Sequence, residues 1–382
     1  MSILSQKRIT KKINNAYIVW FGESNHWMQL EEPAWFIYRN YNSGVKTETI
    51  SQKFSKRYHL NIDESIVFVR DIIIELDKLS SDTILSQENL SIEQFESPAK
   101  FFSRHTYKIN QKILAISFES RLLEYMIHPS LAHLEIIKKT KPHFILEIFS
   151  LSASSILKIA GKAWAEVDVN SLKRRLFIEI TGLLYGKSDK DWLSFVHGSA
   201  VSNQDEAIIL STACGSGKST LAALLCKEGL KLLSDDFVAI DARFCKAYPF
   251  PAALSVKDGS FPVLQPLYNQ LENSETFHFK NTNKTVKYLR FPDEDSFYKP
   301  LPVRILVFVK YNPAKPFSFR KVPTLEAFRR FNEEAWVSHL PANARKFIKW
   351  FPGLKCYELE FSDNKRAVKV ILGLFGANLE TK

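Results

Sequence analysis

Residues Glu206–Gly229, EAIILSTACGSGKSTLAALLCKEG, constrain the fold more than any other part of the sequence. The apolar run Ala207–Leu210 is typical of a buried strand, a turn of small residues follows at Thr212–Gly217, and an apolar helix is predicted from Lys218 onward. A strand, a tight turn and a helix in this order are typical of a sheet that is covered by helices. The segment therefore predicts an α/β domain.

The same turn matches the phosphate-binding pattern GxxxxGK[ST], except that Thr212 stands in the first glycine position. Small residues let backbone N–H groups curl around phosphate oxygens, and the helix N-terminus adds unsatisfied donors and partial positive charge. Lys218 is then expected against the β and γ phosphates, and the Ser219 hydroxyl on Mg²⁺. The predicted cofactors are ATP and Mg²⁺. The predicted nucleotide-binding residues are Thr212, Ala213, Cys214, Gly215, Ser216, Gly217, Lys218, Ser219 and Thr220. A chance match to so degenerate a pattern is the alternative.

Two further groups accompany this loop. The segment LLSDDF ends an apolar run with Asp235 and Asp236, so that one carboxylate can hold Mg²⁺ while the other accepts a proton from an attacking hydroxyl. An Asp-Asp pair can equally form a turn or a helix cap. His197 precedes the loop at another predicted strand end, where it fits a charge-tuning or proton-relay role as well as a structural one.

Length and composition bound the remaining interpretations. The chain has 382 residues, a formal net charge of +11 and 45% hydrophobic residues, which favours two or three packed domains. No apolar run is long enough to span a membrane, the N-terminus lacks a secretory signal, and the four cysteines form no CxxC pair. We expect a cytoplasmic protein with reduced thiols and no membrane association. The basic residues are scattered, so a nucleic-acid partner is not expected; Ala344–Trp350 is predicted as an amphipathic surface helix, a binding patch being the alternative.

Changes in periodicity divide the chain into three predicted domains, 1–85, 86–190 and 191–382, with Ser80–Pro98 as a polar linker. The first has strand-like stretches followed by helices, the second mixes strands and helices, and the third alternates strands with helices. The predicted helices are Pro33–Asn40, Thr47–Tyr58, Asp63–Leu79, Arg121–Leu134, Val169–Tyr185 and about Asp363 to Phe375. The predicted strands include Lys112–Phe118, Phe144–Phe149, Phe195–Val196, Leu232–Leu233, Val238–Ile240, Arg304–Val309 and Cys356–Phe361.

Several motifs together resemble the catalytic domain of HPr kinase/phosphorylase and related kinases. They are His197-Gly198, Cys214–Thr220, Gly229 and Ser234–Asp236, with weaker similarity in Tyr248–Ser260, Val286–Pro292 and Val303–Val309. The resemblance implies an α/β P-loop kinase domain of the HPr kinase/PEP carboxykinase type, and phosphoryl transfer from ATP to a hydroxyl, usually a protein serine.

The resemblance also implies roles for individual residues. Asp236 would be the general base and His197 part of the catalytic network, while Lys218 would bind phosphate and Ser219 and Asp235 would face Mg²⁺. The glycine-rich segment that supplies the family's second magnesium ligand is not found in this chain. Lys257 and Arg290 could supply positive charge to the transferring phosphoryl group instead, or be ordinary surface residues.

Residues Tyr41–Leu79 resemble the PqqD-like domain, a small winged-helix-like domain that recognises precursor peptides in ribosomal-peptide modification pathways. This resemblance implies that a leader peptide adds as a strand to the hairpin edge in residues 16–79. Winged-helix DNA-binding domains share the same compact plan.

The leading hypothesis is therefore an ATP-dependent kinase acting on a hydroxyl of a peptide or protein. Small-molecule kinase activity on a sugar or amino acid is one alternative, and a catalytically inactive, nucleotide-gated peptide- or DNA-binding protein is another. A homo-oligomer is left open, because HPr kinases are hexamers.

Overall fold

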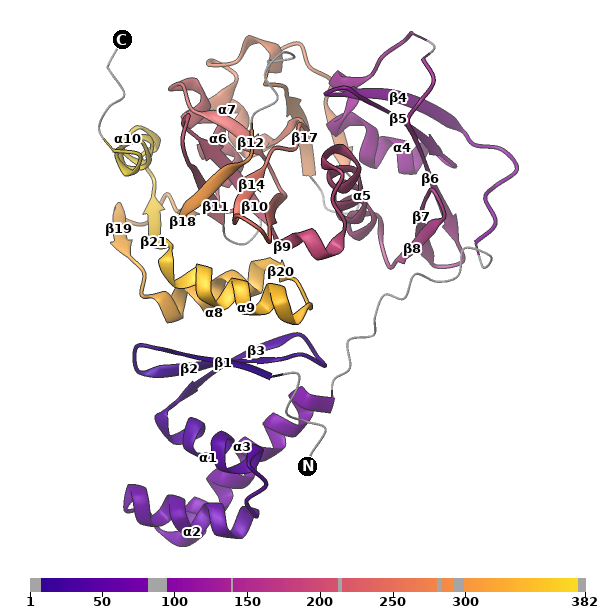
Figure 1. Ribbon diagram of the computed structural model, residues 1–382. Coiled ribbons are helices and arrows are strands. Elements are labelled where there is room, and N and C mark those ends of the chain that lie inside the picture. Colours follow the sequence, from indigo (N-terminus) through magenta and orange to yellow (C-terminus); the bar gives the residue numbers. More distant parts are fainter. Residues whose placement is uncertain are drawn as a thin grey trace. The chain divides into compact units, whose positions relative to one another are not determined.

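The computed structural model describes residues 8–81, 95–138, 140–211, 215–279, 284–291 and 299–376. The chain forms two compact units (Figure 1). The first unit comprises Met1–Ser86 and Pro323–Gly353, and the second comprises Gln87–Val322 and Leu354–Lys382. This division differs from the predicted one, because residues 323–353 leave the third predicted domain and 87–190 is not a separate unit.

The first unit is built around an antiparallel sheet of order β1-β2-β3. Its strands are β1 (Arg8–Ile13), β2 (Ala16–Phe21) and β3 (His26–Glu31), and its N-terminal helices are α1 (Glu32–Asn42), α2 (Thr47–Tyr58) and α3 (Ile62–Ser81). The three helices predicted in this part of the sequence are confirmed. The α3 helix forms because Val69, Ile73 and Leu76 recur on one face and are all buried.

The second segment of the first unit contains α8 (Thr324–Glu334), β20 (Ala335–Val337) and α9 (Pro341–Trp350). Trp27 lies edge-on to Phe328 and Phe347, with ring centroids 5.5 and 5.3 Å away. The Asn25 side chain donates to the Val337 carbonyl at 2.7 Å. The predicted amphipathic helix at Ala344–Trp350 is confirmed, and its apolar face is buried within the first unit.

In the second unit, a five-stranded sheet has the order β4-β5-β6-β7-β8. The strands are β4 (Ser103–Ile109), β5 (Lys112–Phe118), β6 (Phe144–Leu151), β7 (Ser154–Ile159) and β8 (Lys162–Glu166). The helix α5 (Val169–Tyr185) is confirmed as predicted; Asp168 caps its start and Gly186, at φ 62°, ends it.

The prediction of one helix over Arg121–Leu134 is wrong. The α-helix α4 ends at Ile127, and two 3₁₀ turns, η3 (His128–Ser130) and η4 (Ala132–Leu134), follow it. Pro129 explains the break, because its nitrogen carries no hydrogen to donate and its ring clashes with the carbonyl four residues earlier.

A larger mixed sheet in the second unit carries the phosphate-loop segment. Its strands run in the order β12-β10-β11-β18-β14-β13-β9, and β21 pairs with β18 and β19. They are β9 (Trp192–Val196), β10 (Gly198–Ser202), β11 (Ala207–Ser211), β12 (Lys231–Ser234), β13 (Val238–Asp241), β14 (Lys246–Tyr248), β18 (Leu301–Tyr311), β19 (Ser318–Lys321) and β21 (Lys355–Phe361). Every strand predicted in this region lies within one of them.

Around this sheet lie α6 (Lys218–Lys227), the short α7 (Phe261–Leu264) and α10 (Asn364–Leu374). A three-stranded sheet of order β15-β17-β16 adds β15 (Leu254–Lys257), β16 (Phe277–Phe279) and β17 (Lys284–Leu289). Asp363 caps α10 as predicted, its carboxylate accepting from the Arg366 N–H at 3.1 Å. The whole fold is mixed α/β with several sheets.

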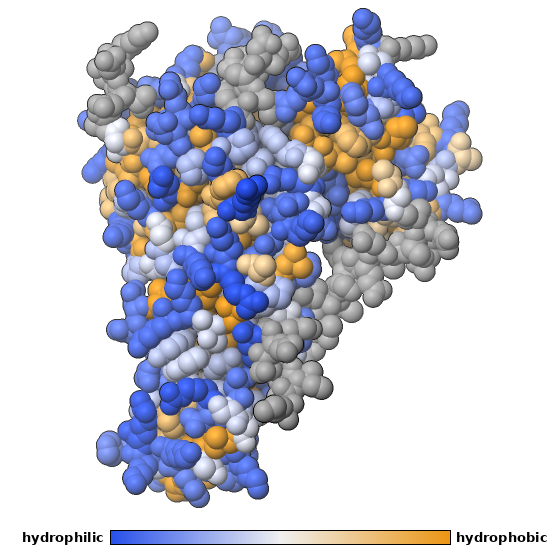
Figure 2. All heavy atoms as spheres, viewed as in Figure 1, coloured by the Kyte–Doolittle hydropathy of each residue, from blue (hydrophilic) through white to orange (hydrophobic). Residues whose placement is uncertain are grey.

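Hydrophilic side chains cover most of the viewed surface, with apolar patches between them (Figure 2). None of the described helices combines the length and the apolar character that a membrane crossing needs.

Candidate functional site

Two glycines shape the turn between β11 and α6. Gly215 and Gly217 have φ values of 87° and 89°, in the left-handed region that side chains disfavour. A Cβ on Gly217 would also lie 3.0 Å from the Cβ of Tyr311. The turn is held against the end of β18 by a hydrogen bond from the Tyr311 N–H to the Ser216 carbonyl, at 2.8 Å. The first three predicted loop residues, Thr212, Ala213 and Cys214, lie outside the described residues.

The α6 helix begins directly after this turn. Lys218 is its first residue and is buried, with 5% of its surface exposed, and Ser219 follows it. The first turn carries no acidic side chain, so the partial positive charge of the helix N-terminus is not neutralised locally. The Thr220 hydroxyl lies 2.6 Å from that of Ser260, which ties the helix to the segment before α7. An anion is favoured at such a helix start.

Asp235 follows β12 and is buried beside the helix start. Its Oδ1 atom accepts hydrogen bonds from the Ser219 hydroxyl, at 3.0 Å, and from the Ser199 hydroxyl. Its Oδ2 atom is buried with no hydrogen-bond partner among the described residues. Burial, and then the charge of Asp236, raise the pKa of the Asp235 carboxyl to about 7.

This arrangement suits a divalent cation. Mg²⁺ prefers oxygen ligands, usually one or two from the protein with the rest from water and phosphate. The Ser219 hydroxyl and the buried Asp235 carboxylate supply such oxygens, and a cation would satisfy the Oδ2 atom, for which the described residues provide no hydrogen-bond partner. The residues present therefore fit Mg²⁺.

Asp236 adopts a left-handed backbone conformation, with φ 60°. A ring N–H of His197 can donate to its carbonyl oxygen, since Nδ1 lies 3.2 Å from it. The side chain of Asp236 is exposed, whereas that of Asp235 is buried. The two predicted carboxylates are thus adjacent, one sequestered beside Ser219 and the other accessible to a substrate.

The close packing of β10 against β11 requires glycine at position 198, directly after His197. A Cβ at this position would lie 2.6 Å from the Leu210 carbonyl oxygen, closer than real Cβ atoms come to a backbone atom. Only glycine lets β10 approach β11 here, so the strand that begins beside His197 stays in register with the strand that leads into the loop.

Lys173 was missed by the sequence reasoning. This residue of α5 is partly buried, and its ammonium lies over the rings of Phe177 and Tyr288, at 5.5 and 5.8 Å. Burial lowers the pKa of Lys173, and the negative charges of Asp236 and Asp235 oppose that shift. A signal was available, because Lys173 interrupts the apolar stripe that Phe177, Ile180 and Leu184 continue along the helix.

Lys257 and Arg290, the two further basic residues predicted near the phosphoryl group, lie on different strands of the second unit or directly after them. Lys257 ends β15, the strand whose Ser255 backbone lies close enough to the Asp235 carboxyl to lower its pKa. Arg290 follows β17, and its backbone exchanges hydrogen bonds with the Gln270 side chain. The structure therefore places Lys257 on a strand that borders the aspartates, and gives Arg290 a local structural partner.

A scan against protein-family models finds no match to this chain, and no curated protein matches it significantly. Functional inference accordingly depends on the geometry described above.

Proposed function

We propose that the protein is an ATP-dependent kinase that phosphorylates a hydroxyl of a peptide or protein. One observation carries the proposal: the Ser219 hydroxyl and the buried Asp235 carboxylate share a hydrogen bond at the start of α6, and the second carboxylate oxygen finds no hydrogen-bond partner in the described part of the chain. A glycine turn, a helix start without acidic residues and a buried lysine surround that pair. Together they suit a nucleotide triphosphate with its metal ion.

The chain's own residues supply positioning and proton transfer. Lys218 and the N–H groups of the turn hold the γ-phosphate, and bound Mg²⁺ would neutralise charge that develops on the phosphate oxygens. Asp236 accepts the proton of the attacking hydroxyl as its oxygen bonds to phosphorus and the bond to the β-phosphate oxygen breaks. The leaving group is ADP. His197 holds the Asp236 backbone, and the ammonium of Lys173 lies within electrostatic reach of Asp236 and Asp235.

The acceptor class follows from the first unit. Its sheet has β1 and β3 at its two edges, and neither pairs with a further strand of that unit among the described residues. An extended peptide can add to such an edge through main-chain hydrogen bonds. This supports a peptide acceptor, in line with the resemblance of Tyr41–Leu79 to peptide-recognition domains.

The substitution Asp236→Asn tests the proposal. Asparagine tolerates the left-handed backbone at this position, so the variant removes the basic carboxylate without straining the turn. We expect transfer to fall by roughly 10²–10⁴-fold, while the affinity for Mg²⁺·ATP stays close to that of the wild type. Mass spectrometry of a co-expressed acceptor peptide measures the transfer, and isothermal titration calorimetry measures nucleotide binding.

Asp205→Asn is the matched control, because Asp205 is an exposed aspartate of the same unit in the turn between β10 and β11. Transfer at the wild-type rate by Asp236→Asn would reject the assigned base. Phosphorylation of small-molecule hydroxyls alone would exclude the peptide acceptor, and ATP binding without any phosphorylated product would favour a nucleotide-gated binding protein.

A further inference from the structure

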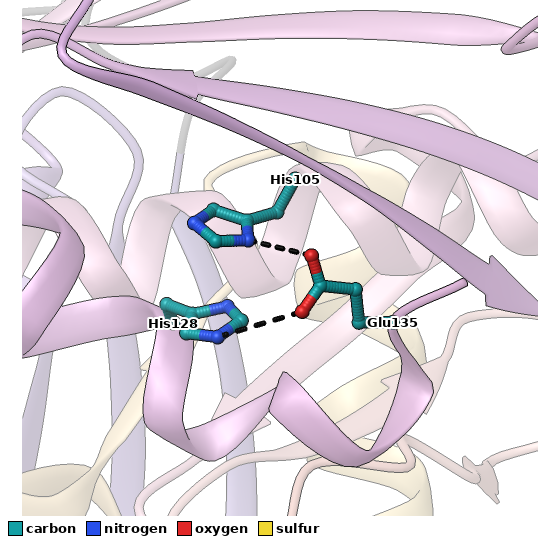
Figure 3. A group of neighbouring side chains, drawn as sticks. All are labelled: His105, His128 and Glu135. Carbon is teal, nitrogen blue, oxygen red and sulfur yellow. Dashed lines mark hydrogen bonds and ion pairs between the residues drawn. The ribbon is translucent and has the colours of Figure 1, made fainter. Parts of the chain in front are cut away.

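A cluster of two histidines and a glutamate lies in the second unit, formed by residues that the proposed kinase chemistry does not use. His105 is on β4, His128 begins η3 and Glu135 follows η4. One atom from each side chain can be chosen so that all three atoms lie within 4.8 Å of one another. Figure 3 shows both imidazole rings turned toward Glu135, each facing a different carboxylate oxygen.

The ligand atoms of the two histidines lie near the carboxylate oxygens of Glu135. His105 Nδ1 lies 2.7 Å from Glu135 Oε1, and His128 Nε2 lies 3.8 Å from Glu135 Oε2. Neighbouring ligand atoms around a tetrahedral zinc ion, bound at roughly 2.0–2.2 Å, are about 3.3 Å apart. The two distances fall on either side of this value. The imidazole rings are stacked at an interplanar angle of 22°, so one ring must turn before the in-plane lone pairs of both point at a shared ion.

The outer partners of both histidines strengthen the case. The other ring nitrogen of His105, Nε2, contacts the carboxylate of Glu124. The other ring nitrogen of His128, Nδ1, lies 2.7 Å from the Tyr107 hydroxyl. Metal-binding histidines almost always donate their second N–H to a carboxylate or another oxygen, which fixes the tautomer and the ring orientation. Both histidines have such a partner, and in each case the nitrogen left over is the one that faces Glu135.

The fold also holds the three groups in place. The two imidazole rings stack with centroids 4.0 Å apart, and Tyr107 bridges to Glu135 through a backbone pair. The break at Pro129 positions the chain, because it ends α4 at Ile127 and lets the two 3₁₀ turns carry Glu135 back to β4.

We propose that His105, His128 and Glu135 form a binding site for a divalent transition-metal ion of the Zn²⁺ class, with an open fourth position. Two imidazole nitrogens and one carboxylate suit Zn²⁺, Co²⁺ or Ni²⁺, whereas Mg²⁺ and Ca²⁺ prefer oxygen ligands throughout. The site links β4 to the turns after α4. It is independent of the proposed phosphoryl transfer.

Zinc binding by the full-length protein tests the proposal. The protein is stripped with a chelator and then titrated with Zn²⁺ in excess Mg²⁺, which occupies oxygen-ligand sites such as that of Ser219 and Asp235. We expect one tightly bound zinc per chain, measured by elemental analysis, with the affinity measured by competition against a chromogenic chelator. Cobalt in the same site should give the intense visible absorption of four-coordinate Co²⁺.

The variants His105→Gln and His128→Gln should each lose the bound zinc and the cobalt spectrum. Glu124→Gln should keep the site but weaken its affinity by about 10–100-fold, because it removes only an outer partner. His26→Gln is the control, since His26 is an exposed histidine of the first unit. Circular dichroism of each variant verifies folding.

Two results would overturn the proposal. One is a wild-type protein that retains no zinc under these conditions, and the other is equal zinc retention by His105→Gln and His128→Gln. Either would show that the cluster is a hydrogen-bonded group without a metal-binding role.

Discussion

At the scale of single residues, the absence of a Cβ at Gly198 allows the strands β10 and β11 to lie close together. Gly198 faces the Leu210 carbonyl so closely that a Cβ would lie 2.6 Å away. Because Gly198 pairs with Ser211, the last residue of β11, a displacement here is transmitted to the strand that leads into the loop before Lys218. The geometry of the site therefore depends on a residue that has no side chain.

The substitution Gly198→Ala should reduce the stability of the second unit by about 1–3 kcal/mol, the usual cost of overpacking a well-packed interior. Thermal unfolding measures the loss, and hydrogen exchange should show faster exchange in β10 and β11. Gly373→Ala is the control, because a Cβ at Gly373 meets nothing within 4 Å and alanine favours the helix α10. Equal stability of Gly198→Ala and the wild type would show that the strands separate at little cost.

The sequence predicts part of the site at this scale. Ser219, Asp235 and Asp236 follow from the loop motif and the strand that ends in carboxylates, and the structure brings all three together. Ser199 was not predicted, although its hydroxyl donates to Asp235, because one serine in an apolar strand has no distinctive pattern. The charge of Lys173 reaches the aspartates from α5, and only the tertiary fold reveals such proximity.

At the scale of elements, the sequence predicts where a helix lies more reliably than where it ends. Val169–Tyr185 was predicted with its limits, because an apolar stripe and a terminal glycine define it. The predicted helix Arg121–Leu134 ignored Pro129, and the same break creates the turns that carry His128 and Glu135. Residues that gather at an irregular turn lack a periodic signal, which is why sequence reasoning did not find the histidine cluster.

The edge strands β1 and β3 should respond to a bound peptide in hydrogen exchange. If an acceptor peptide adds as a further strand, its main chain should protect amides of β1 (Arg8–Ile13) or β3 (His26–Glu31) from hydrogen exchange. The central strand β2 should change little, because both of its neighbours are already paired. Exchange is measured by mass spectrometry with and without a candidate acceptor peptide.

The matched control is β4, an edge strand of the five-stranded sheet in the second unit, whose exchange should not respond to the peptide. Protection confined to the second unit would contradict strand addition and would place peptide recognition in that unit instead.

At the scale of the whole molecule, the first unit is assembled from two distant parts of the chain. The sequence of β2 indicates that its sheet is covered on both sides. Its six residues, AYIVWF, are nearly all apolar and show no alternation. Such a strand is typical of a sheet that is covered on both faces. Val19 and Phe21 belong to a core cluster with Tyr38 of α1 and Leu76 of α3, while Trp20 lies beside Trp27, which α8 and α9 cover. The sequence alone does not say which helices provide the second cover.

Substitution of two buried phenylalanines, one in each unit, distinguishes the observed division into units from the predicted domains. Phe347→Ala removes a fully buried ring of α9 and should destabilise the first unit by roughly 3–5 kcal/mol. Hydrogen exchange should then accelerate in β1 to β3 and in α8, and the second unit should keep its protection. Thermal unfolding should show one transition shifted and the other unmoved.

Phe308→Ala is the reciprocal variant, because Phe308 is equally buried but belongs to β18 of the second unit. It should accelerate exchange in β11 and β21 and spare the first unit. Should Phe347→Ala instead loosen β11 and β18, residues 323–353 would belong energetically to the large mixed sheet of the second unit, as the predicted domain limits imply.

The two-part construction of the first unit has a consequence for synthesis on the ribosome. The strands that bear Trp20 and Trp27 emerge early, but α8 and α9 leave the exit tunnel only after most of the second unit has been translated. At about 5–20 residues per second, the nascent hairpin stays uncovered on one face for on the order of ten seconds to a minute. During that interval its tryptophans can be bound by chaperones that recognise apolar chain, so the first unit matures only after α8 and α9 have been synthesised.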